Sequence, residues 1–415
     1  MEKDFMSTWT KQKLSQLCDV RDGTHDSPKP SSLGYPLVTS KHIINNKVDI
    51  SSAYLINEID YDSVNKRSKV DRYDILISMI GTVGEVAFIN ESPKFAIKNV
   101  GLIKTSNKIL GRYLYYYLIS PNGRNTLQSF LTGSTQKFIS LSKLRDFPVT
   151  IPENETQKQI IYFLEAYDDL IENNEKRIRI LEEMASRLYN ESFVKFRFPG
   201  YERVRMVDSG TEYGKVPEGW EVVEMQSIAK IVDCLHTKKP KEIKTGNRIL
   251  LQLNNILDNG MIDLTKKYLI SDDDYKKWTK NIELREGDCV VTNVGRIAAS
   301  AQIGSGVFAA AGRNMTVIRA EKIPYSFLIH YLHSRHMERE VSKKTDAGAI
   351  MGSLNVKNIY LLKVLLPEKP VLELFSKIVS AYRVQMNMLH KQNFNLSRTR
   401  DLLIPQLVTG RRELF

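Results

Sequence analysis

The sequence predicts an α+β protein of two duplicated domains, separated by two long helices that form an antiparallel coiled coil. Three observations predict this fold. The two halves of the chain repeat one another, each half begins with short apolar runs between turn residues, and each half ends in a heptad of apolar side chains.

The internal repeat has a period of about 215 residues, which indicates a duplicated domain because solenoid repeats are far shorter. Five matches occur in the same order in both halves, and this collinearity establishes the duplication. KLSQLCDVRDGTH after Trp9 matches EMQSIAKIVDCLH after Trp220, DILISMIGTVG (from Asp74) matches DCVVTNVGRIA (from Asp288), KNVGLIK matches RNMTVIR, YLYYYLIS matches FLIHYLHS, and GSTQKFISLSKLRDFPVTIP (133–152) matches GAIMGSLNVKNIYLLKVLLP (348–367).

Each half divides into a compact part and a helical part. Runs such as DILISMIG and DCVVTNVG, bounded by Gly, Asn and Asp, predict strands, and 111–120 and 325–342 predict helices among them. The Gly- and Pro-rich stretch between the halves predicts a linker. The predicted segments are a first domain over 1–152, a helical region over 153–198, the linker over 199–219, a second domain over 220–367 and a helical region over 368–415.

The two helical regions share one apolar seam with alternating steps of four and three, the pattern of a coiled coil. In an antiparallel pair, one register places Asn174 opposite Asn393 and Ile178 against Leu389. Such a polar pair costs stability but specifies register. The alternative is an amphipathic helix packed on its own domain. The predicted seam comprises Ile160, Leu164, Tyr167, Ile171, Asn174, Ile178, Leu181 and Leu188, with Phe375, Val379, Tyr382, Met386, Leu389, Asn393, Leu396 and Leu403.

The composition favours a polyanionic partner. Sixty Lys and Arg against 48 Asp and Glu give a net charge of +12, although a basic protein without such a partner would have the same charge. Cys18, Cys234 and Cys289 lie far apart without a CxxC pair, which argues against a zinc knuckle or a disulfide framework. With no apolar run of about 18 residues and no signal-peptide pattern, we expect a cytoplasmic protein without membrane contact.

Catalytic motifs are missing from the sequence. We find no Walker A loop, no GxGxxG after a strand, no Asn-Pro-Pro-Tyr or Asp-Pro-Pro-Tyr, and neither GxSxG nor HExxH. We therefore predict no catalytic residue, no metal and no cofactor in this chain.

Several phrases resemble one known family over essentially the full length. They are LLIPQLVTGRREL at the C-terminus, its counterpart RLYNESFVKFRFPG, KVPEGW at the start of the second half, DGTHDSP at 22–28, and GSTQKFISLSKLRDFPVTIP. With these phrases the chain resembles the specificity subunit of type I restriction–modification systems. It departs from the family pattern at GAIMGSLNVKNI and CLHTKK in the second half.

The resemblance implies a DNA-recognition subunit that is not an enzyme by itself. Each compact part would be a target-recognition domain that reads one half of a bipartite, asymmetric site in double-stranded DNA. Two methyltransferase subunits with S-adenosylmethionine would bind the helical regions, and restriction/translocase subunits would bring ATP and Mg²⁺. A seam of roughly 30 residues is about 45 Å long and exceeds one turn of B-DNA, about 34 Å, so the helices could set the gap.

Residues for DNA contact are predicted from side chains that suit bases or phosphates in the loops of both halves. The first-half set is Thr24, His25, Lys29, Ser40, Lys41, His42, Gly81, Thr82, Lys98, Asn99, Ser134, Thr135, Gln136 and Lys137. The second-half set is His236, Lys238, Lys239, Gln252, Asn254, Asn255, Asn293, Arg296, Arg313 and Asn314. Because Asn99 and Asn314 recur in both halves, a role as structural turn residues is the alternative for them.

Three other functions compete with this interpretation. A self-sufficient modification enzyme would need the missing catalytic motifs. A coiled-coil scaffold would bind DNA weakly and without sequence preference. A stand-alone DNA-binding regulator would be expected to carry a helix-turn-helix phrase, and none is visible.

Overall fold

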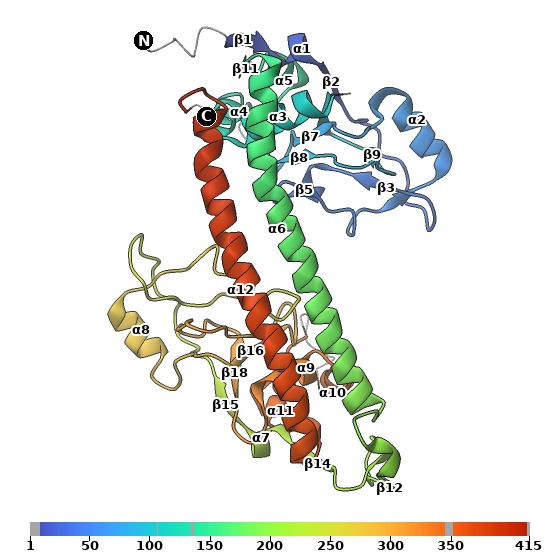
Figure 1. The fold of residues 1–415 in the computed structure, drawn as a ribbon, viewed down its shortest axis with the longest axis vertical. Helices are drawn as coiled ribbons and strands as arrows, with labels where there is room; N and C mark the ends of the chain where they lie inside the picture. Colours follow the sequence, from blue (N-terminus) through green and yellow to red (C-terminus); the bar gives the residue numbers. More distant parts are fainter. Residues whose placement is uncertain (1–8, 106, 134–136, 345–351, 413–415) are drawn as a thin grey trace. The chain divides into compact units, whose positions relative to one another are not determined.

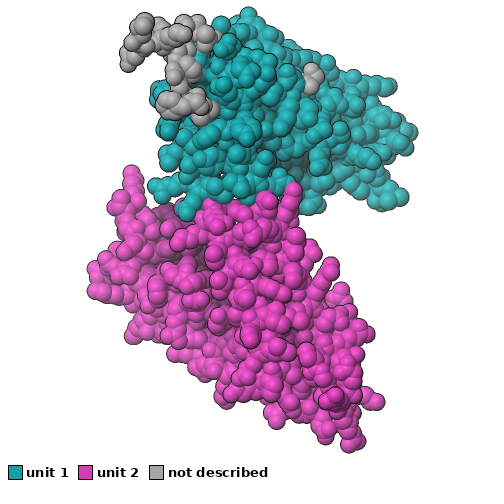
Figure 2. Space-filling view, viewed as in Figure 1, with its two compact units in different colours: residues 1–172, 395–415 teal, residues 173–394 magenta. Residues whose placement is uncertain are grey.

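A computed structural model describes residues 9–105, 107–133, 137–344 and 352–412. The chain forms two compact units, one of residues 1–172 with 395–415 and one of residues 173–394 (Figure 2). Each unit takes part of both long helices, so neither unit coincides with one half of the sequence.

The first unit is built on a four-stranded antiparallel sheet in the order β2-β10-β7-β8. Figure 1 labels β2, β7 and β8 of this sheet. These strands are β2 (Asp19–Asp22), β10 (Val100–Lys104), β7 (Ile75–Ser78) and β8 (Val86–Phe88). Side chains alternate across β7, as the period of two requires. Ile75 and Ile77 pack with helix α3 (Lys108–Ile119), whereas Leu76 packs with Val38 and Ile97 on the other face.

Smaller elements surround this sheet. β1 (Thr10–Lys13) pairs with β11 (Pro148–Ile151), β3 (Tyr35–Val38) lies between β6 (Leu55–Ile56) and β9 (Ala96–Ile97), and β4 (Ile43–Ile44) pairs with β5 (Lys47–Val48). The remaining helices are α1 (Leu14–Leu17), η2 (Ser40–His42), α2 (Glu58–Ser68), α4 (Pro121–Ser129) and α5 (Leu141–Arg145).

The second unit repeats the sheet in the order β15-β18-β16-β17. Its strands are β15 (Ala229–Asp233), β18 (Met315–Ala320), β16 (Cys289–Thr292) and β17 (Ser300–Gln302), and β14 (Glu221–Glu224) pairs with β19 (Lys363–Leu366) as β1 does with β11. Its helices are α7 (Met225–Ile228), η5 (Leu253–Asn255), α8 (Asp272–Trp278), α9 (Tyr325–Leu332), α10 (Arg335–Lys344) and α11 (Val356–Tyr360). The helix predicted over 325–342 is thus two helices, α9 and α10.

One ion pair supports the duplication at the level of side chains. Lys104 on β10 binds Asp74, which directly precedes β7, with an N–O distance of 2.6 Å. In the second unit Arg319 on β18 binds Asp288, which directly precedes β16, also at 2.6 Å. The same charge pair therefore joins the same two strands in both domains.

The long helices are α6 (Asn154–Tyr189), followed by the π-helical turn Asn190–Val194, and α12 (Lys369–Leu407). In the first unit Ile160 and Leu164 of α6 share a core with Ile404 and Leu407 of α12. In the second unit Ile178 packs with Met386 and Leu389, while Ala185 shares a core with Phe375 and Val379. Rising numbers on α6 meet falling numbers on α12, so the helices are antiparallel within each unit.

The two seam asparagines meet in the predicted register. Asn174 Nδ2 donates a hydrogen bond of 2.8 Å to Asn393 Oδ1, and Ile178 and Leu389 lie in the same apolar cluster. Every predicted seam residue is buried or half-buried. The pattern of a coiled coil therefore describes the packing better than a helix that rests only on its own domain.

Residues 199–219, predicted as a linker, are an ordered part of the second unit. They contain η4 (Tyr201–Arg203) and a hairpin of β12 (Met206–Asp208) and β13 (Lys215–Pro217). Val216 is buried, and Tyr213 stacks on His336 and donates a 2.7 Å hydrogen bond to the Lys363 carbonyl. The Gly-rich composition marks the turns correctly, but the apolar and aromatic residues between them pack against the domain.

Candidate nucleic-acid interface

In the first unit, three loop segments converge at one corner beside the main sheet. An isolated parallel bridge joins Thr24 to Lys98, and the backbone N–H of Asn99 donates to the Thr24 carbonyl at 3.1 Å. Ser40 Oγ donates to the Asn99 carbonyl at 3.0 Å. Asn99 has φ 53°, a left-handed conformation that Asn tolerates better than most residues. We call this group, with His25, the first corner.

His25 connects the first corner to a buried carboxylate. Its Nε2 lies 3.0 Å from Asp22 Oδ2, and its Nδ1 lies 2.8 Å from Asn99 Oδ1. Arg67 also binds Asp22, which offsets the cost of burying that carboxylate. Both ring nitrogens are therefore engaged within the domain, although the His25 side chain is 68% exposed.

The 3₁₀ turn η2 is closed by a buried side chain. The backbone N–H of Thr39 donates to His42 Nδ1 at 2.8 Å, and the N–H of Asp49 donates to the His42 carbonyl at 2.8 Å. Burial, followed by the neighbouring charge of Lys41, lowers the pKa of His42, which keeps Nδ1 free to accept. The closed turn presents Lys41 to solvent.

The second unit builds an equivalent corner with different side chains. Asn314 has φ 62° and its carbonyl accepts from the N–H of Asn293 at 2.9 Å. The turn η5 is closed as η2 is, because the Gln252 N–H donates to Asn255 Oδ1 at 2.8 Å. Asn254 is exposed at the position of Lys41. We call Asn314, Arg313 and this turn the second corner.

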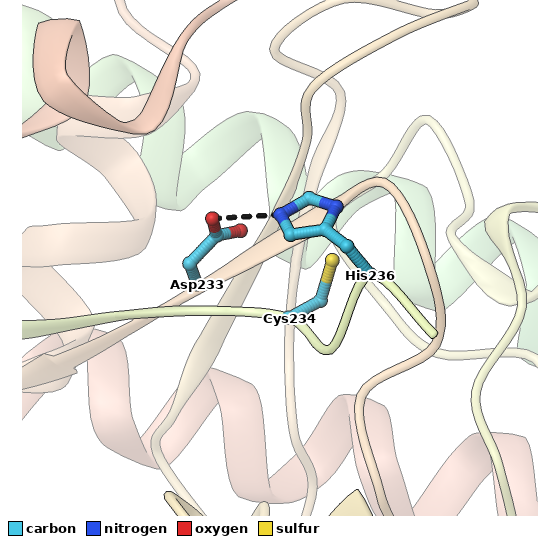
Figure 3. Close-up of side chains that lie close together, drawn as sticks. All are labelled: Asp233, Cys234 and His236. Carbon is cyan, nitrogen blue, oxygen red and sulfur yellow. Dashed lines mark hydrogen bonds and ion pairs between the residues drawn. The ribbon is translucent and has the colours of Figure 1, made fainter. Parts of the chain in front are cut away.

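Asp233, Cys234 and His236 are a group of metal-ligand side chains that come together within the described part of the chain (Figure 3). His236 Nε2 lies 2.9 Å from Asp233 Oδ2, which is a hydrogen-bond distance. The first unit has the same Asp–His pair at Asp22 and His25, where Gly23 replaces the cysteine. Burial raises the pKa of the Cys234 thiol and opposes formation of the thiolate that a metal would bind. The group therefore is a repeated Asp–His pair beside a buried thiol.

Comparisons with known proteins agree with this duplicated architecture. Residues 6–183 match the family model described as the type I restriction modification DNA specificity domain. Over 97% of this chain and 93% of the relative, the sequence is 23% identical to the type I restriction enzyme MjaIX specificity subunit of Methanocaldococcus jannaschii. The chain is therefore similar to type I restriction enzyme specificity subunits over nearly its full length, and residues 6–183 match their DNA specificity domain.

Two further proteins of this kind resemble the chain. The type I restriction enzyme EcoBI specificity subunit of Escherichia coli is 30% identical over 148 residues, which cover 34% of this chain and 30% of that protein. The crystal structure of a type I restriction–modification S subunit from M. genitalium matches with a TM-score of 0.53 at 14% identity, covering 96% of both chains. At that identity the structural likeness supports the fold alone.

Several of the residues predicted to contact DNA are exposed. These are His25, Lys29, Lys41, Gly81, Thr82, Lys137, His236, Lys238, Lys239, Asn254, Arg296 and Arg313, while Thr24, Lys98, Asn99, Gln252 and Asn314 are half-buried. Some are already engaged within the chain. Lys98 binds Ser27, Lys239 lies 3.6 Å from the Tyr268 ring centroid, and Arg296 binds Asp258.

The structure corrects the prediction for four buried residues. Ser40 and His42 close the first corner, Asn255 Nδ2 donates to the carbonyls of Asp263 and Lys266, and Asn293 Nδ2 donates to the Leu354 carbonyl. All four side chains are buried and make hydrogen bonds inside the domains, which disfavours the predicted contact with a base edge. Ser134, Thr135 and Gln136 lie outside the described residues.

The sequence prediction missed Asp22, Asp233 and Arg67, which support the corners. The available signal was the shared spacing of DGTH and DCLH, which places Asp three residues before His in both halves. No signal of this kind marks Arg67, because its contact with Asp22 spans 45 residues.

None of the described helices is long and apolar enough to cross a membrane.

Proposed function

We propose that this chain selects the DNA sequence for a type I restriction–modification complex and catalyses no step itself. Each recognition domain reads one half of a bipartite, asymmetric site in double-stranded DNA. The observation that carries the proposal is the pair of equivalent corners, which share backbone geometry but expose different side chains. Two domains of one fold with different contact residues suit two different half-sites.

The charges at the corners suit a DNA backbone. Lys98 in the first corner and Arg313 in the second occupy equivalent places, and exposed Lys29, Lys137, Lys238 and Lys239 lie in the neighbouring loops. Each Lys or Arg that contacts a phosphate releases a condensed counterion, so binding should weaken steeply as salt concentration rises. The net charge of +12 acts in the same direction.

In this proposal the long helices set the spacing between the half-sites. Helix α6 contains 36 residues and contributes to both compact units without a break. At 1.5 Å per residue it is about 54 Å long, which exceeds one turn of B-DNA, about 34 Å. The asparagine pair fixes the register of α6 against α12, and we infer that this register sets the gap in the target.

Exposed apolar side chains on the helices provide a docking surface for two methyltransferase subunits, which bring S-adenosylmethionine. Large apolar residues seldom stay exposed without a partner when they gather along one element. In turn, restriction/translocase subunits supply ATP- and Mg²⁺-dependent steps. The exposed apolar positions are Tyr162, Phe163, Leu170, Ile180 and Met184 on α6, with Leu374, Val384, Met388, Phe394 and Leu402 on α12.

Genome-wide adenine methylation tests the proposed function. Cells carrying this gene and its neighbouring methyltransferase gene are compared with cells in which this gene is deleted. A split methylated motif that disappears on deletion is expected, and replacing residues 1–152 with another domain of the family should change only one half. Unchanged methylation, with the protein expressed and bound to its partner, would favour the scaffold function instead.

The docking surface has a separate test in the purified complex. Tyr162→Asp places a charge on a side chain that is 82% exposed and should weaken methyltransferase binding without unfolding the chain. Gln159→Asp, at an exposed polar position one turn away, is the matched control. Equal sedimentation of both variants with the methyltransferase would remove Tyr162 from the interface.

A further inference from the structure

The turns η2 and η5 share one hydrogen-bonding arrangement but contain different side chains. In both, a reciprocal pair of hydrogen bonds joins the residue before the turn to its last residue, Thr39 with His42 and Gln252 with Asn255. In both, an N–H from the following loop caps the last residue at 2.8 Å, from Asp49 and from Asp263. The backbone of the two turns is therefore fixed in the same way by buried side chains.

The middle residue of each turn is exposed and differs between the domains. It is Lys41 in η2 and Asn254 in η5. Among the described residues neither side chain makes a hydrogen bond or an ion pair, and neither fills the core. A rigid turn that displays an unengaged, polar and variable side chain has the properties required of a base-reading position.

The neighbours of the two turns do not vary in this way. η2 is tied to Asn99 by the Ser40 hydrogen bond, and Lys98 precedes that asparagine. η5 is next to Gly312, where an added Cβ would lie 3.3 Å from Gln252 Nε2, and Arg313 and Asn314 follow. A basic residue before a left-handed Asn thus stands beside both turns. Contacts that two domains share cannot distinguish two half-sites, so the shared cation suits a phosphate.

We propose that Lys41 and Asn254 are specificity-determining residues that read base edges in the major groove, each in its own half-site. Lys donates to the O6 and N7 acceptors of guanine, and Asn pairs with N6 and N7 of adenine. Lys41 therefore selects a guanine in one half-site and Asn254 selects an adenine in the other. Lys98 and Arg313 hold the adjacent phosphates. This inference rests on the proposed function and assigns the reading to one residue in each domain.

Reciprocal exchange of the two residues tests the inference in the complete complex. The variants Lys41→Asn and Asn254→Lys are expressed with the methyltransferase, and the methylated motif is determined for each. Each exchange should alter the preference at one base pair in one half-site and leave the other half unchanged. Lys66→Asn, at an exposed lysine on α2 of the first domain, is the matched control and should keep the motif intact.

For variants that methylate poorly, the base preference is measured instead by binding to a set of DNA duplexes. Each duplex carries one of the four base pairs at one position of the motif found with the unmodified protein. Lys41→Ala and Asn254→Ala should each lose a preference of roughly 5- to 150-fold at a single position. Lys98→Ala and Arg313→Ala should weaken all duplexes alike and reduce the salt slope by about one.

The outcomes separate the two proposals. A preference that is unchanged, or lowered equally at every position, in Lys41→Ala and Asn254→Ala would overturn the base-reading assignment and leave the proposed function standing. If the unmodified complex shows no split motif, the proposed function fails together with this inference. Thermal unfolding of each variant at the unmodified temperature excludes misfolding, because both side chains lie outside the core.

Discussion

The two duplicated domains carry opposite charges at the same place in the repeat, where each domain meets the long helices of its own unit. The first unit has Asp168 on α6, and the equivalent residue in the second unit is Arg383 on α12. Both side chains are largely shielded from water. The comparison shows how one fold accommodates either charge.

In the first unit the carboxylate is satisfied by partners from two other helices. Arg400 Nη1 on α12 lies 2.5 Å from Asp168 Oδ1, and Tyr116 on α3 donates to Oδ2 at 2.6 Å. A second pair, Arg112 Nε with Glu165 Oε1 at 2.8 Å, lies alongside. The first domain is thus joined to its helices by a network of compensated charges.

In the second unit the cation has no such network. Arg383 is 7% exposed, and among the described residues its hydrogen bond is a long one, 3.4 Å to the Gly260 carbonyl. Burial lowers the pKa of Arg383 and, together with the charge of Arg383, also lowers the pKa values of His330, His333 and His390. Burial raises the pKa of the nearby Glu182. Among the described residues, the first domain thus pairs its buried charge with close counter-charges, whereas the second domain places histidines with lowered pKa values around Arg383.

The largest expected effect is loss of the compensated network. Asp168→Ala should lower the free energy of unfolding by about 2–3 kcal/mol, because Tyr116 would lose its acceptor and Arg400 would keep only the exposed Asp401 as a partner. Chemical unfolding of the full chain measures this loss. Asp169→Ala, at the exposed neighbouring carboxylate, should change little. Equal effects of the two substitutions would show that the network contributes nothing specific.

A smaller effect is expected at the asparagine pair, where the repeat equivalents of Asn174 and Asn393 are the apolar Leu389 and Ile178. Asn174→Leu should cost about 1–2 kcal/mol because the Asn393 amide loses its partner. The double variant with Asn393→Leu should recover that loss, since two apolar residues then match the rest of the seam. Additive losses in the double-mutant cycle would contradict a direct interaction.

The pH dependence of unfolding should report on a buried histidine of the second unit, His330. Burial lowers the pKa of His330 from 6.5 to about 4, so between these values the unfolded chain binds a proton that the folded chain does not. Stability from this group is complete above pH 6.5 and is lost as pH falls toward 4. His330→Gln should flatten the pH dependence of the unfolding midpoint in that window.

The smallest change in the free energy of unfolding is expected at Arg383, although its equivalence to Asp168 would suggest a large one. Arg383→Met should alter the free energy of unfolding by no more than about 1 kcal/mol, or raise it, because Arg383 forms no close ion pair among the described residues and the cost of burying its charge is removed. Unfolding under the conditions used for Asp168→Ala provides the measurement. A loss as large as that of Asp168→Ala would mean that Arg383 has strong partners in solution.

The duplication, the paired helices and their register follow from the sequence because they depend on order and period along the chain. An apolar seam that repeats every 3.5 residues can be recognised in the local sequence. The asparagine within each seam then indicates one alignment of the two helices. The corners could be located approximately for the same reason, since Lys98–Asn99 and Arg313–Asn314 recur at matching places.

Which side chains face outward at the corners was decided by the tertiary structure alone. His42 and Asn255 look like DNA contacts in the sequence, yet each is buried and closes its own turn, whereas Lys41 and Asn254 beside them are exposed. The partners of Asp168 and the isolation of Arg383 depend on residues more than 50 positions away. Burial and pairing are properties of long-range packing, and no local pattern of residues records them.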